Sequence, residues 1–120
     1  MPAAQFPRAR RLSGKTDFGR VFREGRNLRS GWLTLVVLPN ERSVSRFGCT
    51  VRRQAFPRAV DRNRIKRWCR EAFRRNQQLL PSGFDLVVLV VRPAEDITFQ
   101  EVEKRLIKLS QHLVLQKGSS

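Results

Sequence analysis

Residues 58–75 have the sequence RAVDRNRIKRWCREAFRR, and this stretch decides the fold because it predicts a long helix with two unlike faces. An apolar stripe recurs at helical spacing and consists of Ile65, Trp68, Cys69, Ala72 and Phe73. The far side carries a row of cations in steps of four, namely Arg62, Lys66, Arg70 and Arg74. We expect the apolar face to pack on a sheet and the cationic face to remain outside.

The charge of this helix exceeds what its own carboxylates can neutralise. Asp61 and Glu71 are its acidic residues, and like charges four residues apart destabilise a helix mildly. The whole chain has 25 Lys plus Arg against 10 Asp plus Glu, a formal net charge of +15. Such a surplus is typical of proteins that bind a polyanion, and the excess of arginine favours phosphate contacts.

The chain shows no membrane signal. No apolar run reaches the ~18 residues that a spanning helix needs, and residues 1–7 lack the apolar core of a signal peptide. We therefore expect a cytoplasmic protein with no membrane partner and no small-molecule substrate.

The region before the basic helix predicts one helix and two strands. Ser13 or Thr16 is the expected cap of a short helix that stops at Gly25. Residues 32–38 and 46–52 are rich in branched and aromatic side chains and predict two strands, which we expect to pair antiparallel through the polar loop between them.

The region from Pro57 onward completes the fold. We expect the basic helix to span 57–80, with Pro57 in its first turn. Residues 84–91 are almost all apolar and predict a strand buried on both faces. Residues 98–101 form a capping box before a last helix, whose apolar stripe is Phe99, Val102, Leu106, Leu109 and Leu113.

These elements predict an α+β fold, a single-domain sandwich of helices packed on a small mixed sheet. We expect residues 1–11 to form an extended basic arm, residues 12–115 to form the domain, and residues 116–120 to form a flexible tail.

Residues 61–74, DRNRIKRWCREAFR, resemble the Arg-Asn-Arg helix of the bacterial ribonuclease P protein family. The resemblance extends over roughly residues 6–115. Its flanking matches are Arg11-Leu12, Asp17-Phe18, Val21-Phe22, Gly25, Arg46-Phe47-Gly48, Thr50-Val51 and Phe84-Asp85-Leu86-Val87-Val88.

The resemblance implies a fold and a set of partners. The fold is like domain 2 of ribosomal protein S5, ordered α-β-β-(β)-α-β-α, with a left-handed connection between parallel strands, whereas general rules favour a right-handed one. The implied function is the protein subunit of ribonuclease P, one protein per catalytic RNA, which assists removal of the 5′ leader from precursor tRNA.

The resemblance also assigns roles to residues. The implied contacts to the catalytic RNA are Arg62, Asn63, Arg64, Lys66, Arg67, Arg70 and Arg74. The implied leader contacts are Phe18, Phe22 and Arg53, with auxiliary basic contacts from Arg11 and Arg58. The family usually has two lysines where this chain has Arg53 followed by Gln54, so one positive charge is kept and one is lost.

Two alternatives remain open. Phenylalanines at i and i+4, such as Phe18 and Phe22, are by themselves more typical of a core than of a binding site. A generic basic RNA-binding or ribosomal protein would carry similar charge, but it has no need of the Arg-Asn-Arg spacing.

We expect no catalytic residue and no metal site in this chain. His112 has no fixed partner in the sequence and the carboxylates are scattered, whereas a two-metal nuclease needs them clustered. The resemblance implies that the RNA performs the hydrolysis with Mg²⁺ bound mainly by that RNA. Cys49 and Cys69 match no zinc spacing, and we expect them to be buried free thiols.

Overall fold

The computed structural model describes residues 11–12, 14–78, 80, 82–93 and 97–118, with side chains as far as residue 113. The predicted basic arm, except for Arg11, and the cap Ser13 lie outside the described residues. The elements follow in the order α1 (Gly14–Glu24), β1 (Arg26–Ser30), β2 (Leu33–Pro39), β3 (Arg46–Val51), α2 (Ala59–Arg75), β4 (Phe84–Val90) and α3 (Phe99–Gly118).

Strand β4 lies inside the sheet, whose order is β1-β2-β4-β3. It pairs antiparallel with β2 and parallel with β3, and nearly all of its residues are buried. This confirms the prediction of a strand covered on both faces. The predicted pairing of β2 with β3 is wrong, because the more apolar β4 lies between them and takes one edge of each.

Strand β1 has no counterpart among the elements predicted from the residue patterns, but with it the chain has the third strand that the family resemblance allowed in the order α-β-β-(β)-α-β-α. It forms a hairpin with β2, and Gly31 in the turn has a positive φ of 60°, which glycine adopts without strain. Leu28 is the one apolar residue of β1 and its buried one, so the segment carries little of the alternation that identifies a strand.

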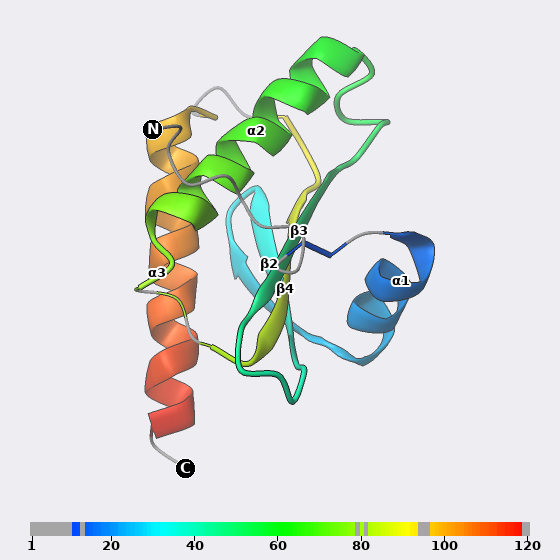
Figure 1. Ribbon diagram of the computed structural model, residues 1–120. Helices are drawn as coiled ribbons and strands as arrows, with labels where there is room; N and C mark the ends of the chain where they lie inside the picture. Colours follow the sequence, from blue (N-terminus) through cyan, green and yellow to red (C-terminus); the bar gives the residue numbers. More distant parts are fainter. Residues whose placement is uncertain (1–10, 13, 79, 81, 94–96, 119–120) are drawn as a thin grey trace, which may run out of the picture.

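The helices cover both faces of the sheet (Figure 1). Helices α2 and α3 pack on one face, where the larger core contains Phe47 of β3 stacked on Phe73 of α2 with ring centroids 4.4 Å apart. Helix α1 packs on the other face, where Val21 meets Val36 and Val87 in a smaller cluster. The structure is therefore a three-layered α+β sandwich around a mixed sheet, as predicted.

Helix α2 is shorter than the predicted span of 57–80. It begins after Arg58, so Pro57 precedes the first turn. It ends at Asn76, whose side-chain amide donates to the Ala72 carbonyl at 2.7 Å and whose backbone N–H donates to Phe73. These two bonds satisfy two of the last carbonyls of the helix, which stops before the sequence breaks at Pro81.

The other helix ends mostly follow the sequence. The backbone N–H of Gly25 closes α1 by donating to Val21 at 2.7 Å, as predicted. The hydroxyl of Thr98 accepts from the Glu101 N–H at the start of α3, which confirms the Thr98 half of the predicted capping box. The carboxylate of Glu101 lies 3.4 Å from Arg105. Thr16 lies inside α1 and is not its cap.

Candidate nucleic-acid interface

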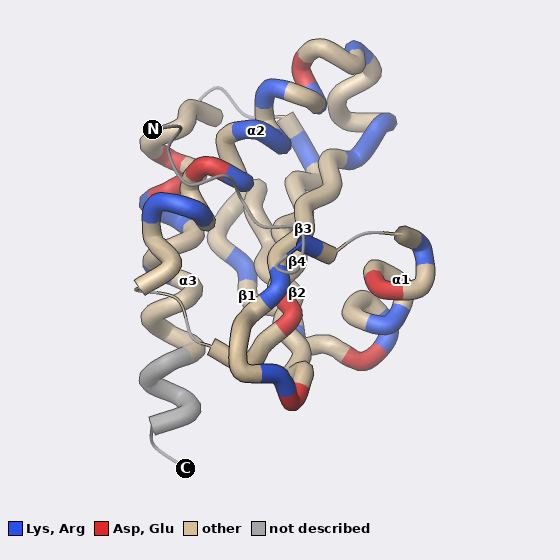
Figure 2. The backbone as a smooth tube through the Cα atoms, viewed as in Figure 1, with Lys and Arg blue, Asp and Glu red and all other residues tan. Residues whose placement is uncertain are grey.

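Helix α2 carries a dense row of cations along the molecule (Figure 2). Its predicted apolar stripe is buried against β3 and α3, apart from Trp68, which is half-buried. Of the predicted RNA contacts, four are exposed: Asn63, Arg64, Arg67 and Arg70. Three are half-buried: Arg62, Lys66 and Arg74.

Arg62 is committed to the loop that precedes the helix. One of its Nη atoms donates to the carbonyl oxygens of Phe56 and Pro57, at 2.8 Å each. These bonds fasten the connection between β3 and α2 and use donors that a phosphate would otherwise receive. Arg62 therefore holds the entry into the helix, a role that the sequence did not reveal.

The remaining α2 cations divide into paired and unpaired ones. Arg64 lies 3.6 Å from Asp61, and Arg74 is hydrogen-bonded to Glu71. Arg75 lies 3.7 Å from Glu103 of α3. The others form no side-chain hydrogen bond or ion pair with the described part of the chain: Lys66, Arg67 and Arg70, here called the unpaired α2 cations. An anion can bind these three without displacing an internal partner.

Helix α1 presents two aromatic rings. Phe18 and Phe22 are stacked with ring centroids 6.3 Å apart. Phe22 is 43% exposed, whereas Phe18 packs so closely on β3 that a Cβ added to Gly48 would lie 2.8 Å from its ring. Phe18 therefore belongs to the packing of α1, the ring of Phe22 is accessible, and a role of either ring in leader binding stays a prediction.

The face of the sheet that α1 covers only in part is hollowed and basic. A cavity of about 320 Å³ lies over the end of β1, β2 and β4, and its lining includes Asn27, Arg29, Thr34, Arg52 and Leu89. In the β1–β2 pairing, Arg29 lies opposite Thr34 and Asn27 lies opposite Val36. These four side chains are therefore on the same face of the sheet, the face on which Val36 packs against α1. The predicted residue Arg53 is exposed, and its neighbour in the chain, Arg52, lines this cavity.

A second cavity joins the two predicted surfaces around the edge strand β3. Its volume is about 470 Å³, and Phe18 lines it together with Arg11, Lys66 and Arg70. The backbone of Arg11 forms a parallel β-bridge with Phe47, and the N–H of Leu12 donates to the Phe47 carbonyl at 2.8 Å. These contacts hold Arg11 at the cavity. The aromatic side and the cationic side of the molecule are therefore continuous through this cavity. Arg58, the other auxiliary residue, is exposed at the start of α2.

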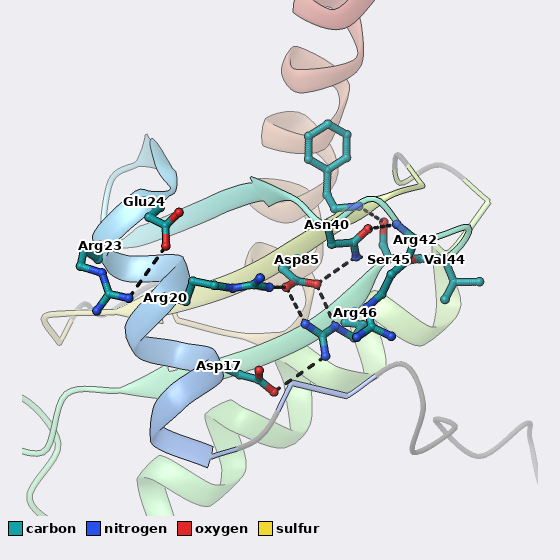
Figure 3. Close-up of polar contacts among 11 residues, drawn as sticks. Asp17, Arg20, Arg23, Glu24, Asn40, Arg42, Val44, Ser45, Arg46 and Asp85 are labelled. Atoms are coloured by element: carbon teal, nitrogen blue, oxygen red, sulfur yellow. Dashed lines mark hydrogen bonds and ion pairs between the residues drawn. The ribbon is translucent and has the colours of Figure 1, made fainter.

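A buried charge network fixes α1 on the sheet (Figure 3). The fully buried carboxylate of Asp85 accepts two hydrogen bonds from Arg46, at 2.9 and 2.8 Å. It also accepts from Asn40 at 2.9 Å and from Arg20 of α1 at 2.8 Å. Asp17 lies 3.8 Å from Arg46 and adds a second link to α1. The sequence alone does not reveal this network, because its members are far apart in the chain.

The network keeps Asp85 ionised. Burial alone opposes its charge, but the hydrogen bonds from Arg46, Asn40 and Arg20 outweigh burial and hold the pKa of Asp85 below its ordinary value. The same carboxylate raises the pKa of Arg46. Every oxygen of Asp85 is thus occupied by protein donors, so this buried carboxylate is a structural anchor.

Over the described ranges of the chain, no group of three or more His, Cys, Asp or Glu side chains is placed to hold a metal ion. None of the helices in the same ranges is long and apolar enough to cross a membrane.

The fold and its charge distribution are those of a small basic α+β protein of the RNA-associated class. The family model described as Ribonuclease P matches residues 6–114. The ribonuclease P protein component of Thermotoga maritima is 37% identical over 108 residues, which cover 87% of this chain and 92% of the relative. That of Nitrosococcus oceani is 45% identical over 84 residues, or 70% of each chain.

Comparison with solved structures leads to the same family. The ribonuclease P protein of Thermotoga maritima superposes with a TM-score of 0.74 at 34% identity, covering 85% of this chain and 96% of that one. The Staphylococcus aureus protein gives a TM-score of 0.77 at 26% identity, covering 88% and 96%. The chain belongs to the ribonuclease P protein family. The predicted function as the protein subunit of this ribonucleoprotein endoribonuclease is confirmed, and the alternative of a generic basic or ribosomal protein is excluded.

Proposed function

We propose that this subunit binds the catalytic RNA through α2 and the 5′ leader of precursor tRNA through α1 and the open sheet face. The observation that carries this proposal is the cavity lined by Phe18 on one side and by Lys66 and Arg70 on the other. A single-stranded leader that emerges from the catalytic RNA can follow this continuous surface without leaving the protein.

The α2 contacts are proposed to differ in kind. The unpaired α2 cations bind phosphates of the catalytic RNA directly, because double-stranded RNA is held through its backbone. Asn63 and Arg64 extend this exposed row toward the start of the helix. Arg74 contributes charge already shared with Glu71, and Arg62 acts mainly by holding the loop before the helix.

The leader contacts are proposed to combine stacking with charge. Phe22 offers an exposed ring, and base stacking on such a ring contributes about 1–3 kcal/mol per base without strong sequence preference. Arg53 and the lining residues Arg29 and Arg52 place cations along the path of the phosphates.

The chemistry is proposed to lie in the RNA. Magnesium ions held mainly by that RNA activate the water, and the protein raises the affinity for precursor tRNA and for those ions. We also propose one protein per RNA and a cytoplasmic location.

The proposal is tested by cleavage of a 5′-extended precursor tRNA with a bacterial ribonuclease P RNA at low magnesium. We expect strong stimulation by the protein and no cleavage by the protein alone. The double variant Arg67→Ala/Arg70→Ala should lose most of the stimulation. A matched control, Lys104→Ala/Lys108→Ala on α3, removes the same charge elsewhere and should retain it. If both double variants lost the same stimulation of cleavage, the effect of the protein would be explained by non-specific charge attraction to RNA.

A further inference from the structure

The two cysteines of the chain lie where β3 packs against α2. Cys49 is on β3 and packs against the core cluster that contains Cys69, on the buried side of α2. The Cys49 thiol also contacts the backbone carbonyl of Lys66, one turn before Cys69 in the same helix. Both are free, and the chain has two cysteines in all. Any thiol chemistry of this protein therefore takes place at this pair.

The pair is open on one side. Cys49 is half-buried and lines the 470 Å³ cavity beside Lys66 and Arg70, whereas Cys69 is fully buried beneath it. The Cys49 S–H group lies 3.7 Å from the Lys66 carbonyl. A small oxidant can thus reach Cys49 from the surface, and only through Cys49 can it affect Cys69.

The surroundings shift the pKa values of the two thiols in opposite directions. The hydrogen bond from Cys69, assisted by the charges of Arg70 and Lys66, lowers the pKa of Cys49 despite its burial. The hydrogen bond to Cys49 and full burial raise the pKa of Cys69. The more accessible sulfur is therefore the one that ionises, and the thiolate is the form that reacts with peroxides.

We propose that Cys49 and Cys69 form a peroxide-oxidisable dithiol, open in the RNA-free protein and covered when RNA binds. The Cys49 thiolate attacks one oxygen of hydrogen peroxide, the O–O bond breaks, and the sulfur becomes a sulfenic acid as hydroxide leaves. The Cys69 sulfur then attacks the Cys49 sulfur, an S–S bond forms, and the sulfenic oxygen leaves as water. Overall, two thiols and one peroxide give one disulfide and two waters.

The second half of this proposal rests on the proposed function. Lys66 and Arg70 belong to the unpaired α2 cations and line the entrance to Cys49. A phosphate bound by these two side chains lies over that entrance and offsets the positive charge that favours the thiolate. Bound RNA therefore both blocks access to Cys49 and makes it less reactive.

The test is peroxide treatment of the full chain, followed by alkylation of the remaining thiols and intact-mass spectrometry. We expect both alkylation sites to be lost together in the monomer and restored by dithiothreitol. In Cys69→Ser, dimedone should trap a sulfenic acid on Cys49, and in Cys49→Ser the remaining thiol should stay reduced. Where Cys69→Ser does not fold by circular dichroism, Cys69→Ala replaces it. Persistence of both thiols, or equal oxidation of the two single variants, overturns the dithiol.

The second arm repeats the oxidation with saturating ribonuclease P RNA. We expect thiol loss to slow several-fold and to recover when high salt releases the RNA. An unchanged rate with RNA bound overturns the covering of the pair. Absence of RNA binding would count against the proposed function, while the first arm would still decide the thiol chemistry.

Discussion

Helices α1 and α2 both carry arginines, but they use them differently. Arg20 of α1 is bound by the buried carboxylate of Asp85, which Arg46 also binds. The unpaired α2 cations (Lys66, Arg67 and Arg70) have no such partner in the described part of the chain. Charge matched by a buried carboxylate positions an element, and unmatched charge on a rigid helix remains for a ligand.

The substitution Asp85→Ala should have the largest effect, because it removes the buried carboxylate that anchors α1. The substitution leaves the guanidinium of Arg46, only 12% exposed, without its main partner. Removing one member of a buried ion pair costs about 3–5 kcal/mol, so urea denaturation should show a loss of that size. The control Asp61→Ala removes an exposed partner of Arg64 and should cost about 0.5 kcal/mol or less. Comparable losses would mean that the network does not anchor α1.

Acid should reproduce part of the same loss. The pKa of Asp85 is lowered in the folded state, and its unfolded value is about 3.9. The stabilisation is therefore fully present above about pH 4 and is lost as pH falls through the lower folded pKa. Unfolding free energies measured from pH 6 downward should fall less steeply for Asp85→Ala than for the original chain. Identical acid profiles would assign the acid sensitivity to other carboxylates.

Phe22→Ala tests the ligand side of α1 without touching its anchor. The residue is 43% exposed and belongs to neither core cluster, so the variant should fold normally. We expect leader-bearing precursor tRNA to bind more weakly by about 1–3 kcal/mol, the contribution of one stacked base. Mature tRNA, which has no leader, is the matched control substrate. Equal weakening for both substrates would remove Phe22 from the leader path.

The sequence predicted those elements whose pattern is local. The apolar stripe of α2, the continuous apolar run of β4 and the Thr98 cap all depend on residues a few positions apart, and all three are observed. The pairing of β2 with β3 failed because strand order depends on competition among distant segments. Strand β1 was missed because an edge hairpin with one apolar residue is defined by its partner more than by its own pattern.

The candidate site followed the same rule. The cationic side of α2 was predicted from spacing alone, but the sequence did not reveal that Arg62 is used by the preceding loop. At the end of β3, the family resemblance pointed to Arg53 as a leader contact, whereas the residue that lines the cavity is Arg52. Neighbouring residues of an extended chain point to opposite faces of a sheet, so a difference of one position changes the face. The Asp85 network brings together residues up to 65 positions apart, which no local pattern encodes.

The smallest expected effect gives the sharpest distinction between paired and unpaired charge. Arg67→Ala removes an exposed cation without a described partner, and Arg74→Ala removes one already bound to Glu71. Each releases counterions only to the extent that it contacts phosphate, so the salt dependence of RNA affinity measures the contact. For Arg67→Ala we expect the slope of log affinity against log salt to decrease by about one, and for Arg74→Ala by clearly less. Similar slopes for both variants would mean that RNA binding breaks the Arg74–Glu71 pair, and pairing within α2 would then not select which cations contact RNA.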